Sequence, residues 1–118
     1  MTKECAVPNC LKIYLTVPEP LRDELYAIAH TQLGSVRAIP GCMDICLLES
    51  KEKLNKFLWE EIWANLELLE KRIASDSFHV VLEVLDMSLH PPQITISKIT
   101  NQDGMKEITA IRGGSQQR

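Results

Sequence analysis

Apolar and polar residues alternate along residues 11–17, and this period-two pattern predicts a strand with one buried face. Further strands are expected over residues 43–49, 57–63 and 93–99. The segment at 57–63 is mostly apolar on both faces, as is typical of a sheet that is covered on both sides. One of its two faces carries Phe57, Trp59, Glu61 and Trp63.

Three segments have the 3.6-residue spacing of amphipathic helices. The first begins near Pro20, which suits a first helical turn, and ends before an Ile-Pro-Gly turn. The second is expected to begin after an N-cap at Asn65, and the third after Ser75 or Asp76, until the prolines at 91–92 stop it. The predicted inward-facing stripes are Leu21, Leu25, Ile28, Gln32 and Val36; Leu66, Leu69 and Ile73; and Phe78, Val81, Leu82, Leu85 and Leu89.

The resulting order is β-α-β-β-α-β, with the second helical region split in two. This order is typical of a ferredoxin-like α+β fold, in which a four-stranded antiparallel sheet carries its helices on one face. The other apolar face then needs a cover, and a second copy is the economical cover for so short a chain. We therefore expect a homodimer packed sheet to sheet.

A length of 118 residues fits one domain, so residues 1–118 are assigned to a single domain with its core at 11–99. The tail at 101–118 is expected to contain one short amphipathic helix, closed by Gly113 and Gly114. The apolar positions of this helix are Met105, Ile108 and Ile111.

The composition is that of an ordinary soluble globule, with 45% hydrophobic and 25% charged residues. A net charge of -3 gives no electrostatic reason to bind nucleic acid or an anionic membrane. No apolar run approaches the roughly 20 residues of a membrane span, and the first residues do not resemble a secretory signal. A cytoplasmic protein without nucleic-acid or membrane partners is expected.

The four cysteines fall into two pairs, Cys5 with Cys10 and Cys42 with Cys46. The second pair lies on a predicted strand, where the two side chains would share a face about 13 Å apart at ~3.3 Å per residue. Zinc requires its sulfur ligands much closer together, so reduced cysteines are expected in place of a metal site or a disulfide.

Three stretches of the chain, "AIPGCMDICLLES", "FLWEEIWANLELLEKRIASDSF" and "PPQITISKI", resemble the antibiotic biosynthesis monooxygenase (ABM) domain family in its small quinol-monooxygenase-like branch. The similarity covers roughly residues 11–99. It implies a dimeric α/β barrel with a pocket between sheet and helices in each subunit. Some members oxygenate phenolic or quinol substrates without flavin, metal or haem, and others degrade haem. The residues that carry the resemblance are the turn Pro40, Gly41 and Cys42, the pair Glu61 and Trp63, and the pair Ser75 and Phe78.

The chain departs from the family pattern in the implied pocket. Members of the branch often carry two histidines where this chain has Arg72 and Ser77. Haem-degrading relatives carry an axial histidine at the position of Leu82, and leucine cannot ligate iron. We therefore expect no cofactor, and the loss of both histidines weakens any mechanism in which an imidazole is the general base.

Four side chains are candidates for the site. Trp63 and Trp59 are candidates for lining a flat substrate pocket, or they fill the core. Glu61 shares their face and is a candidate proton acceptor, or it is the structural ion-pair partner of Arg72 or Arg37. Arg72 could stabilise a phenolate or enolate, or it lies on the outer surface of its helix.

A second group of residues has the chemistry of metal ligands. His79 and Glu83 are four residues apart on one helix face, with Asp86 and His90 further along that face. This row is either a metal site or, as is usual for so polar a face, a solvated surface.

Two functions of different classes follow. The first is a cofactor-independent monooxygenase, an oxidoreductase that acts on a small aromatic or quinol-like compound. The alternative is a non-catalytic dimeric ABM-fold protein that binds a small hydrophobic ligand or a protein partner. The missing histidines leave the assignment as an enzyme open.

Overall fold

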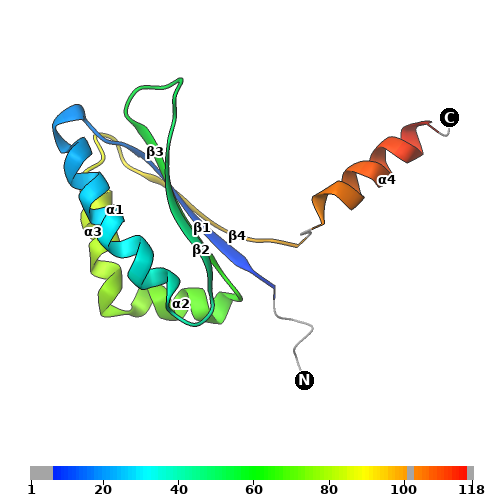
Figure 1. The fold of residues 1–118 in the computed structure, drawn as a ribbon, viewed down its shortest axis with the longest axis horizontal. Helices are drawn as coiled ribbons and strands as arrows, with labels where there is room; N and C mark the ends of the chain where they lie inside the picture. Colours follow the sequence, from blue (N-terminus) through cyan, green and yellow to red (C-terminus); the bar gives the residue numbers. More distant parts are fainter. Residues whose placement is uncertain (1–6, 101–102, 117–118) are drawn as a thin grey trace.

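The computed structural model describes residues 7–100 and 103–116, with side chains up to residue 113. The elements follow the predicted order, with short 3-10 turns at Glu19–Leu21 and Asp76–Phe78. The strands and helices in Figure 1 are β1 (Asn9–Thr16), α1 (Arg22–Arg37), β2 (Cys42–Glu49), β3 (Lys56–Trp63), α2 (Leu66–Ala74), α3 (His79–Asp86), β4 (Gln93–Lys98) and α4 (Gly104–Gln116).

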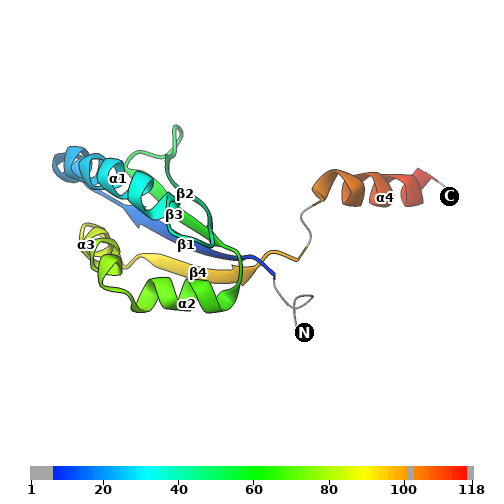
Figure 2. The ribbon, with the colours of Figure 1, turned by 60° about the horizontal axis from the view of Figure 1, so that its bottom comes forward.

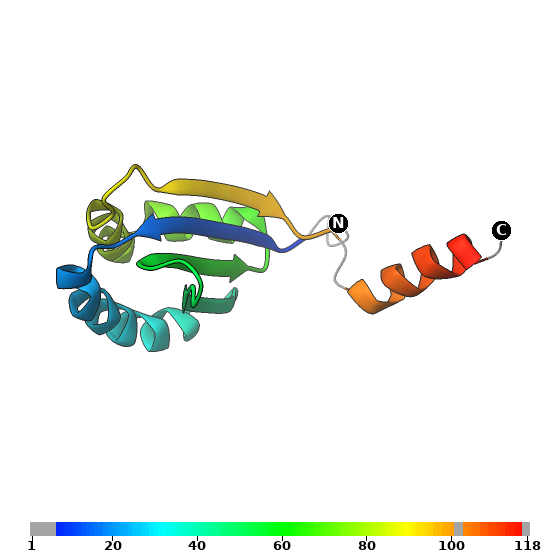
Figure 3. The same ribbon diagram turned by 90° about the horizontal axis from the view of Figure 1, so that it is seen from above.

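The four strands of the described chain form one antiparallel sheet in the order β2-β3-β1-β4, which Figure 3 shows from above. β1 and β3 are the central pair. In their register Glu61 of β3 lies opposite Leu11 of β1, and on its other side Glu61 lies opposite Ile45 of β2. Glu61 therefore occupies the middle of the sheet, on a face whose neighbours are apolar.

The helices α1, α2 and α3 lie on one side of the sheet (Figure 1), so the predicted ferredoxin-like α+β fold is confirmed. In Figure 2, α1 runs along the β2–β3 half of this face, while α2 and α3 lie along the half that contains β4. The helix α4 stands apart, beyond the end of the sheet (Figure 3). No other described element covers the opposite face of the sheet, which we call the open face.

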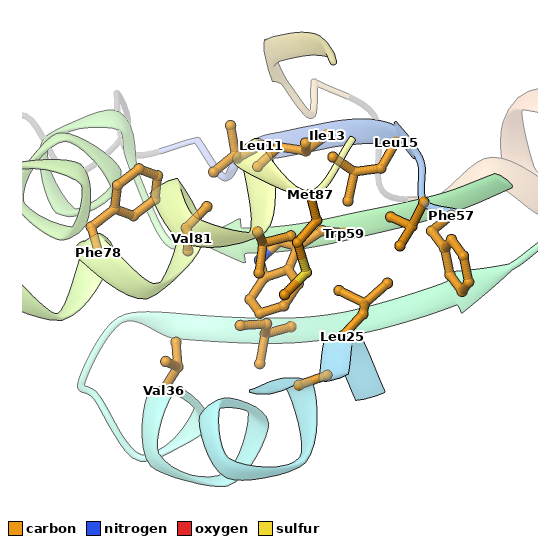
Figure 4. Close-up of a cluster of buried hydrophobic side chains, with 14 of the residues drawn as sticks. Leu11, Ile13, Leu15, Leu25, Val36, Phe57, Trp59, Phe78, Val81 and Met87 are labelled. Atoms are coloured by element: carbon orange, nitrogen blue, oxygen red, sulfur yellow. The ribbon is translucent and has the colours of Figure 1, made fainter. Parts of the chain in front are cut away.

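The core lies between the sheet and these three helices. Trp59 is fully buried near the middle of the cluster in Figure 4, between β1 residues such as Ile13 on one side and Leu25 of α1 on the other. Strand alternation explains this arrangement, since every second residue of β1 and β3 points to the helices. The buried apolar side chains of the two strands include Leu11, Ile13, Leu15, Phe57, Trp59 and Trp63.

The predicted helical stripes are correct only in part. Leu25, Val36, Leu69, Phe78 and Val81 are buried as expected. Leu66 is 41% exposed, Leu82 44% and Leu89 61%. The α3 helix is short, so it buries Val81 and Val84 as a narrow stripe, and Leu89 lies after its end.

The caps also differ from the prediction in one case. Asn65 is the N-cap of α2, and its Oδ1 accepts a hydrogen bond of 2.9 Å from the backbone N–H of Leu68, as predicted. Ser75 precedes the next turn but its side chain does not cap it. The Ser75 hydroxyl instead donates to the carbonyl oxygen of Arg72, at 2.6 Å.

The expected closure of the tail helix at Gly113 and Gly114 is wrong, because α4 continues to Gln116.

The prediction that Cys42 and Cys46 share a face is wrong. A register irregularity between Cys42 and Asp44 places Cys42 opposite Trp63, on the helix side, and Cys46 opposite Glu60, on the open face. A β-bulge adds one residue to a strand and so reverses the side to which the following side chains point. Cys42 and Cys46 are free thiols, as is Cys10, whereas Cys5 lies outside the described residues.

Candidate functional site

Glu61 is the centre of a buried polar network. Its carboxylate is fully buried and accepts four hydrogen bonds, two at each oxygen. The indole N–H of Trp59 donates to Oε2 at 3.0 Å, and that of Trp63 donates to Oε1 at 2.9 Å. Because these residues are spaced by two along β3, both indoles flank the carboxylate on the same face. The other two bonds come from Arg72, whose Nε lies 3.1 Å from Oε1 and whose Nη2 lies 2.9 Å from Oε2.

Arg72 reaches the network from the last turn of α2, where Leu69 lies one turn earlier on the same buried side. Its side chain is only 1% exposed, so the interpretation that placed it on the outer helix surface is wrong. It also donates from Nη1 to Ser77 Oγ at 2.9 Å, and its Cζ lies 5.2 Å from the centre of the Phe78 ring. Arg37, the other candidate partner of Glu61, donates to the backbone oxygen of Ile45 instead.

The ion pair between Glu61 and Arg72 is buried, so its charges and hydrogen-bonding groups have to be satisfied within the protein. A buried carboxylate is stable only when its charge is paired and its lone pairs are filled by donors. The bidentate guanidinium and the two indoles meet both requirements. The four hydrogen bonds occupy the four acceptor sites of the carboxylate, so Glu61 has no lone pair left to offer to a ligand.

A cavity of about 310 Å³ lies beside Trp63 and Arg72. Its apolar wall includes the turn before β2, where Gly41 has a φ of 95°. Such a conformation favours glycine, and a Cβ at Gly41 would lie 2.5 Å from Leu68 Cδ1, so this turn packs directly on α2. The cavity is lined by Ile39, Pro40, Trp63, Leu68, Lys71, Arg72, Ser75 and Ser77.

The structure thus separates the two tryptophans. Trp63 lines the cavity and Trp59, which is not one of the lining residues, fills the core. Ser77, noted in the sequence only as a departure from the family pattern, joins the site: it accepts from Arg72, and its Oγ lies 3.1 Å from that of Ser75. The sequence signal that could have placed Ser77 in the site is its position five residues after Arg72, on the turn that follows α2.

Cys10 and Cys46, on the open face, are poor nucleophiles. Cys10 Sγ lies 3.6 Å and Cys46 Sγ 3.8 Å from the two oxygens of Glu60, whose carboxylate also lies 3.8 Å from Lys12 Nζ. Burial, with the nearby carboxylate of Glu60 adding to it, raises the pKa of Cys10 to about 11. The same causes raise the pKa of Cys46. These thiols remain protonated near neutral pH, and the thiolate is the reactive form.

The row His79, Glu83, Asp86 and His90 is exposed along its whole length, and α3 ends at Asp86. In the part of the chain that the structure describes, no three His, Cys, Asp or Glu side chains lie close enough to hold a metal ion. The interpretation of this row as a metal site therefore has no support in the geometry. Leu82, at the position where haem-degrading relatives place a ligand, is exposed on the same helix.

Together, the ferredoxin-like sheet and the cavity between β3 and α2 define the class: a small α+β domain with a pocket between its sheet and its helices. The chain belongs to the antibiotic biosynthesis monooxygenase family, whose model matches residues 8–84. Over residues 7–100 and 103–116, no helix is both long and apolar enough to cross a membrane.

The chain is also similar to individual proteins. An uncharacterized protein of Synechocystis, sll1783, is 30% identical over 79 residues, which cover 66% of this chain and 54% of that protein. The chain thus spans about half the length of this curated relative. The structure of Rv0793 from Mycobacterium tuberculosis superposes with a TM-score of 0.71 at 18% identity, covering 81% of this chain and 98% of that one. A solved antibiotic biosynthesis monooxygenase superposes with a TM-score of 0.68 at 13% identity, covering 79% and 99%. At these identities the solved structures show a shared fold.

Proposed function

We propose that this chain is a cofactor-independent monooxygenase that acts on a small aromatic or quinol-like compound. The observation that carries the proposal is the cavity beside Trp63, with a buried and immobilised guanidinium on its wall. A volume of about 310 Å³ lies at the lower end of the range of ligand sites and suits a small molecule. Family membership supports the same reaction class.

In such a reaction the substrate supplies the electrons. The deprotonated, electron-rich ring reduces O₂ directly; one oxygen atom enters the product and the other leaves as water. The protein has to exclude bulk water and stabilise the anion. Trp63 lines the apolar wall of the cavity, and Arg72 on the same wall would pair with an anionic oxygen of the substrate.

Glu61 was a candidate proton acceptor, and the geometry favours a different role for it. Its four hydrogen bonds fill both oxygens, and it does not line the cavity. We assign Glu61 to holding Arg72 in position. The proton of the substrate passes through water in the cavity to bulk solvent, which leaves the substrate as an anion that Arg72 can pair with. Arg72 then acts on the substrate, and Glu61 acts through Arg72.

We also propose the homodimer that the sequence predicts, packed through the open face of the sheet. Apolar side chains remain accessible there: Tyr14 is 43% and Leu48 51% exposed, and both lie on this face in the strand register. A second copy would cover them. Light scattering at micromolar concentration should give twice the chain mass, and Leu48→Lys should shift the protein toward the monomer. A wild-type monomer would contradict the proposal.

The enzymatic proposal is tested by oxygen uptake with purified protein over a panel of quinols and phenols. Trp63→Phe and Trp59→Phe form a matched pair, because each removes one indole hydrogen bond to Glu61, and only Trp63 lines the cavity. We expect uptake above the buffer blank and a larger change in KM for Trp63→Phe. A wild-type rate equal to the blank for every compound would reject the enzyme.

The alternative is a non-catalytic dimer that binds a small hydrophobic ligand or a protein partner. It is favoured by Arg72 and Ser77, which replace the imidazoles expected from the family resemblance and leave the cavity without a histidine. Tight binding of aromatic compounds with no oxygen uptake would favour this alternative.

A further inference from the structure

We propose that the natural ligand of the cavity is an aromatic carboxylate, with its ring against Trp63 and its carboxylate at Arg72 and Ser77. This inference rests on the proposed function only in taking the cavity as the binding site. It narrows the class of ligand from any small aromatic compound to an anionic one.

The first observation is the unused hydrogen-bonding capacity of Arg72. A guanidinium has five N–H groups, and the hydrogen bonds to Glu61 and Ser77 use one each on Nε, Nη1 and Nη2. Nη1 and Nη2 therefore each keep one N–H, on a side chain that is 1% exposed and lines the cavity. A buried donor without an acceptor is costly, so these two N–H groups favour a ligand that brings acceptors. The two oxygens of a carboxylate match such a pair.

The second observation is the charge of the cavity wall. The lining residues include two cations, Lys71 and Arg72, and no acid. Arg72 is balanced by Glu61, whereas none of the ion pairs in the described part of the chain includes Lys71. The wall therefore carries one positive charge in excess, which a monoanion would balance.

The third observation is the state of the two hydroxyl groups. Ser75 donates its only hydroxyl hydrogen to the backbone oxygen of Arg72. The Ser77 hydroxyl oxygen accepts a hydrogen bond from Arg72 Nη1. Because the Ser75 hydrogen is already used, the Ser77 O–H is the donor in the contact between the two hydroxyl groups. A carboxylate is a stronger acceptor than the Ser75 hydroxyl, so the Ser77 O–H can rotate to it. Ser77 would thus supply a third donor, while Ile39, Pro40 and Leu68 contact the ring.

The test is calorimetric titration of the full chain with 1-naphthoate and with its neutral analogue 1-naphthylmethanol. We expect the carboxylate to bind at least tenfold more tightly than the alcohol. Ser77→Ala should weaken binding of the carboxylate about tenfold, and Lys71→Gln should weaken it several-fold, and both variants should weaken binding of the alcohol much less. Lys51→Gln, on an exposed turn far from the cavity lining, removes the same charge and should change neither affinity.

The outcomes separate the inference from the proposed function. Equal affinity for acid and alcohol overturns the inference, as does carboxylate binding that is indifferent to both Ser77→Ala and Lys71→Gln. Failure of both compounds to bind overturns it together with the cavity as a site. Selective binding of the acid without oxygen uptake for any aromatic acid supports the inference and counts against the monooxygenase.

Discussion

Replacing Glu61 by glutamine tests whether the buried network stabilises the fold as its geometry indicates. Glu61→Gln keeps the size of the side chain and removes its charge. The carboxylate now accepts four hydrogen bonds, two from Arg72 and one from each indole. A glutamine amide offers one oxygen, which can accept two of them, and its NH₂ group would face donors. The guanidinium of Arg72, 1% exposed, would also lose its counter-charge.

Breaking a buried ion pair from one side costs about 3–5 kcal/mol, because the remaining charge stays buried and unpaired. A small domain is stable by only about 5–15 kcal/mol, so Glu61→Gln should lose a large part of its free energy of unfolding. Removing both charges is much less costly, since no isolated ion is left. The double variant Glu61→Gln with Arg72→Met should therefore lose less free energy of unfolding than the two single variants lose together, by at least ~2 kcal/mol.

The assay is urea unfolding followed by tryptophan fluorescence, at one fixed protein concentration because dimerisation would make stability concentration-dependent. Glu70→Gln is the matched control: it removes the same charge from an exposed side chain of α2, away from the open face. That variant should change the free energy of unfolding by no more than about 0.5 kcal/mol. A loss below ~1 kcal/mol for Glu61→Gln, with no coupling to Arg72→Met, would refute the account of the network.

Three further predictions concern single positions. Asn65→Ala removes the N-cap of α2 and should lower the free energy of unfolding by about 0.5–2 kcal/mol in urea titrations, whereas Asn65→Asp should retain the cap. Gly41→Ala should lower the free energy of unfolding by at least ~1 kcal/mol, because Gly41 has a φ of 95° and a Cβ there would lie 2.5 Å from Leu68 Cδ1. Adding Leu68→Ala to Gly41→Ala should relieve the contact but not the backbone strain, so full recovery of stability would contradict this account. The pKa of Cys10 is raised from 9.0 to about 11, so the folded chain holds the thiol proton more tightly than the unfolded chain does. The protonated thiol therefore contributes to the free energy of unfolding below pH 9, and this contribution is lost as the pH rises through about 11. Relative to Cys10→Ala, the wild type should lose roughly 2 kcal/mol between pH 8 and pH 11, and parallel pH profiles of the two proteins would contradict the shift.

The strands and the placement of Glu61 with the tryptophans follow from the sequence. Period-two alternation is a direct consequence of strand geometry, and it placed Trp59, Glu61 and Trp63 on one face without knowledge of any partner strand. The order of elements then restricted the fold to few choices, of which the ferredoxin-like arrangement is observed. The bulge that moves Cys46 to the open face has no local signature of this kind, because it depends on how β2 pairs with β3.

The position of Arg72 shows where hydrophobicity alone misleads. The stripe through Leu66, Leu69 and Ile73 was drawn from apolar residues, but the buried residues of α2 are Leu69 and Arg72. These two are three residues apart, so they share a helix face as well as any apolar pair does. What hydrophobicity could not supply is the partner: the fully buried Glu61 on β3 requires a cation, and the nearest helix has to provide it.

The network also explains why fold and site are difficult to separate in this chain. Glu61 belongs to the centre of the sheet, Arg72 to a helix, and Ser77 to the turn that follows that helix. Their hydrogen bonds join the three elements that surround the cavity, so the geometry presented to a ligand is set by the same contacts that stabilise the domain. Substitutions in Glu61 or Arg72 should therefore change stability and binding together. Ser77 lies at the edge of the network, and Lys71 lies outside the network on the cavity wall. Binding and stability can be varied separately at these two residues, so they are the informative positions for defining the ligand.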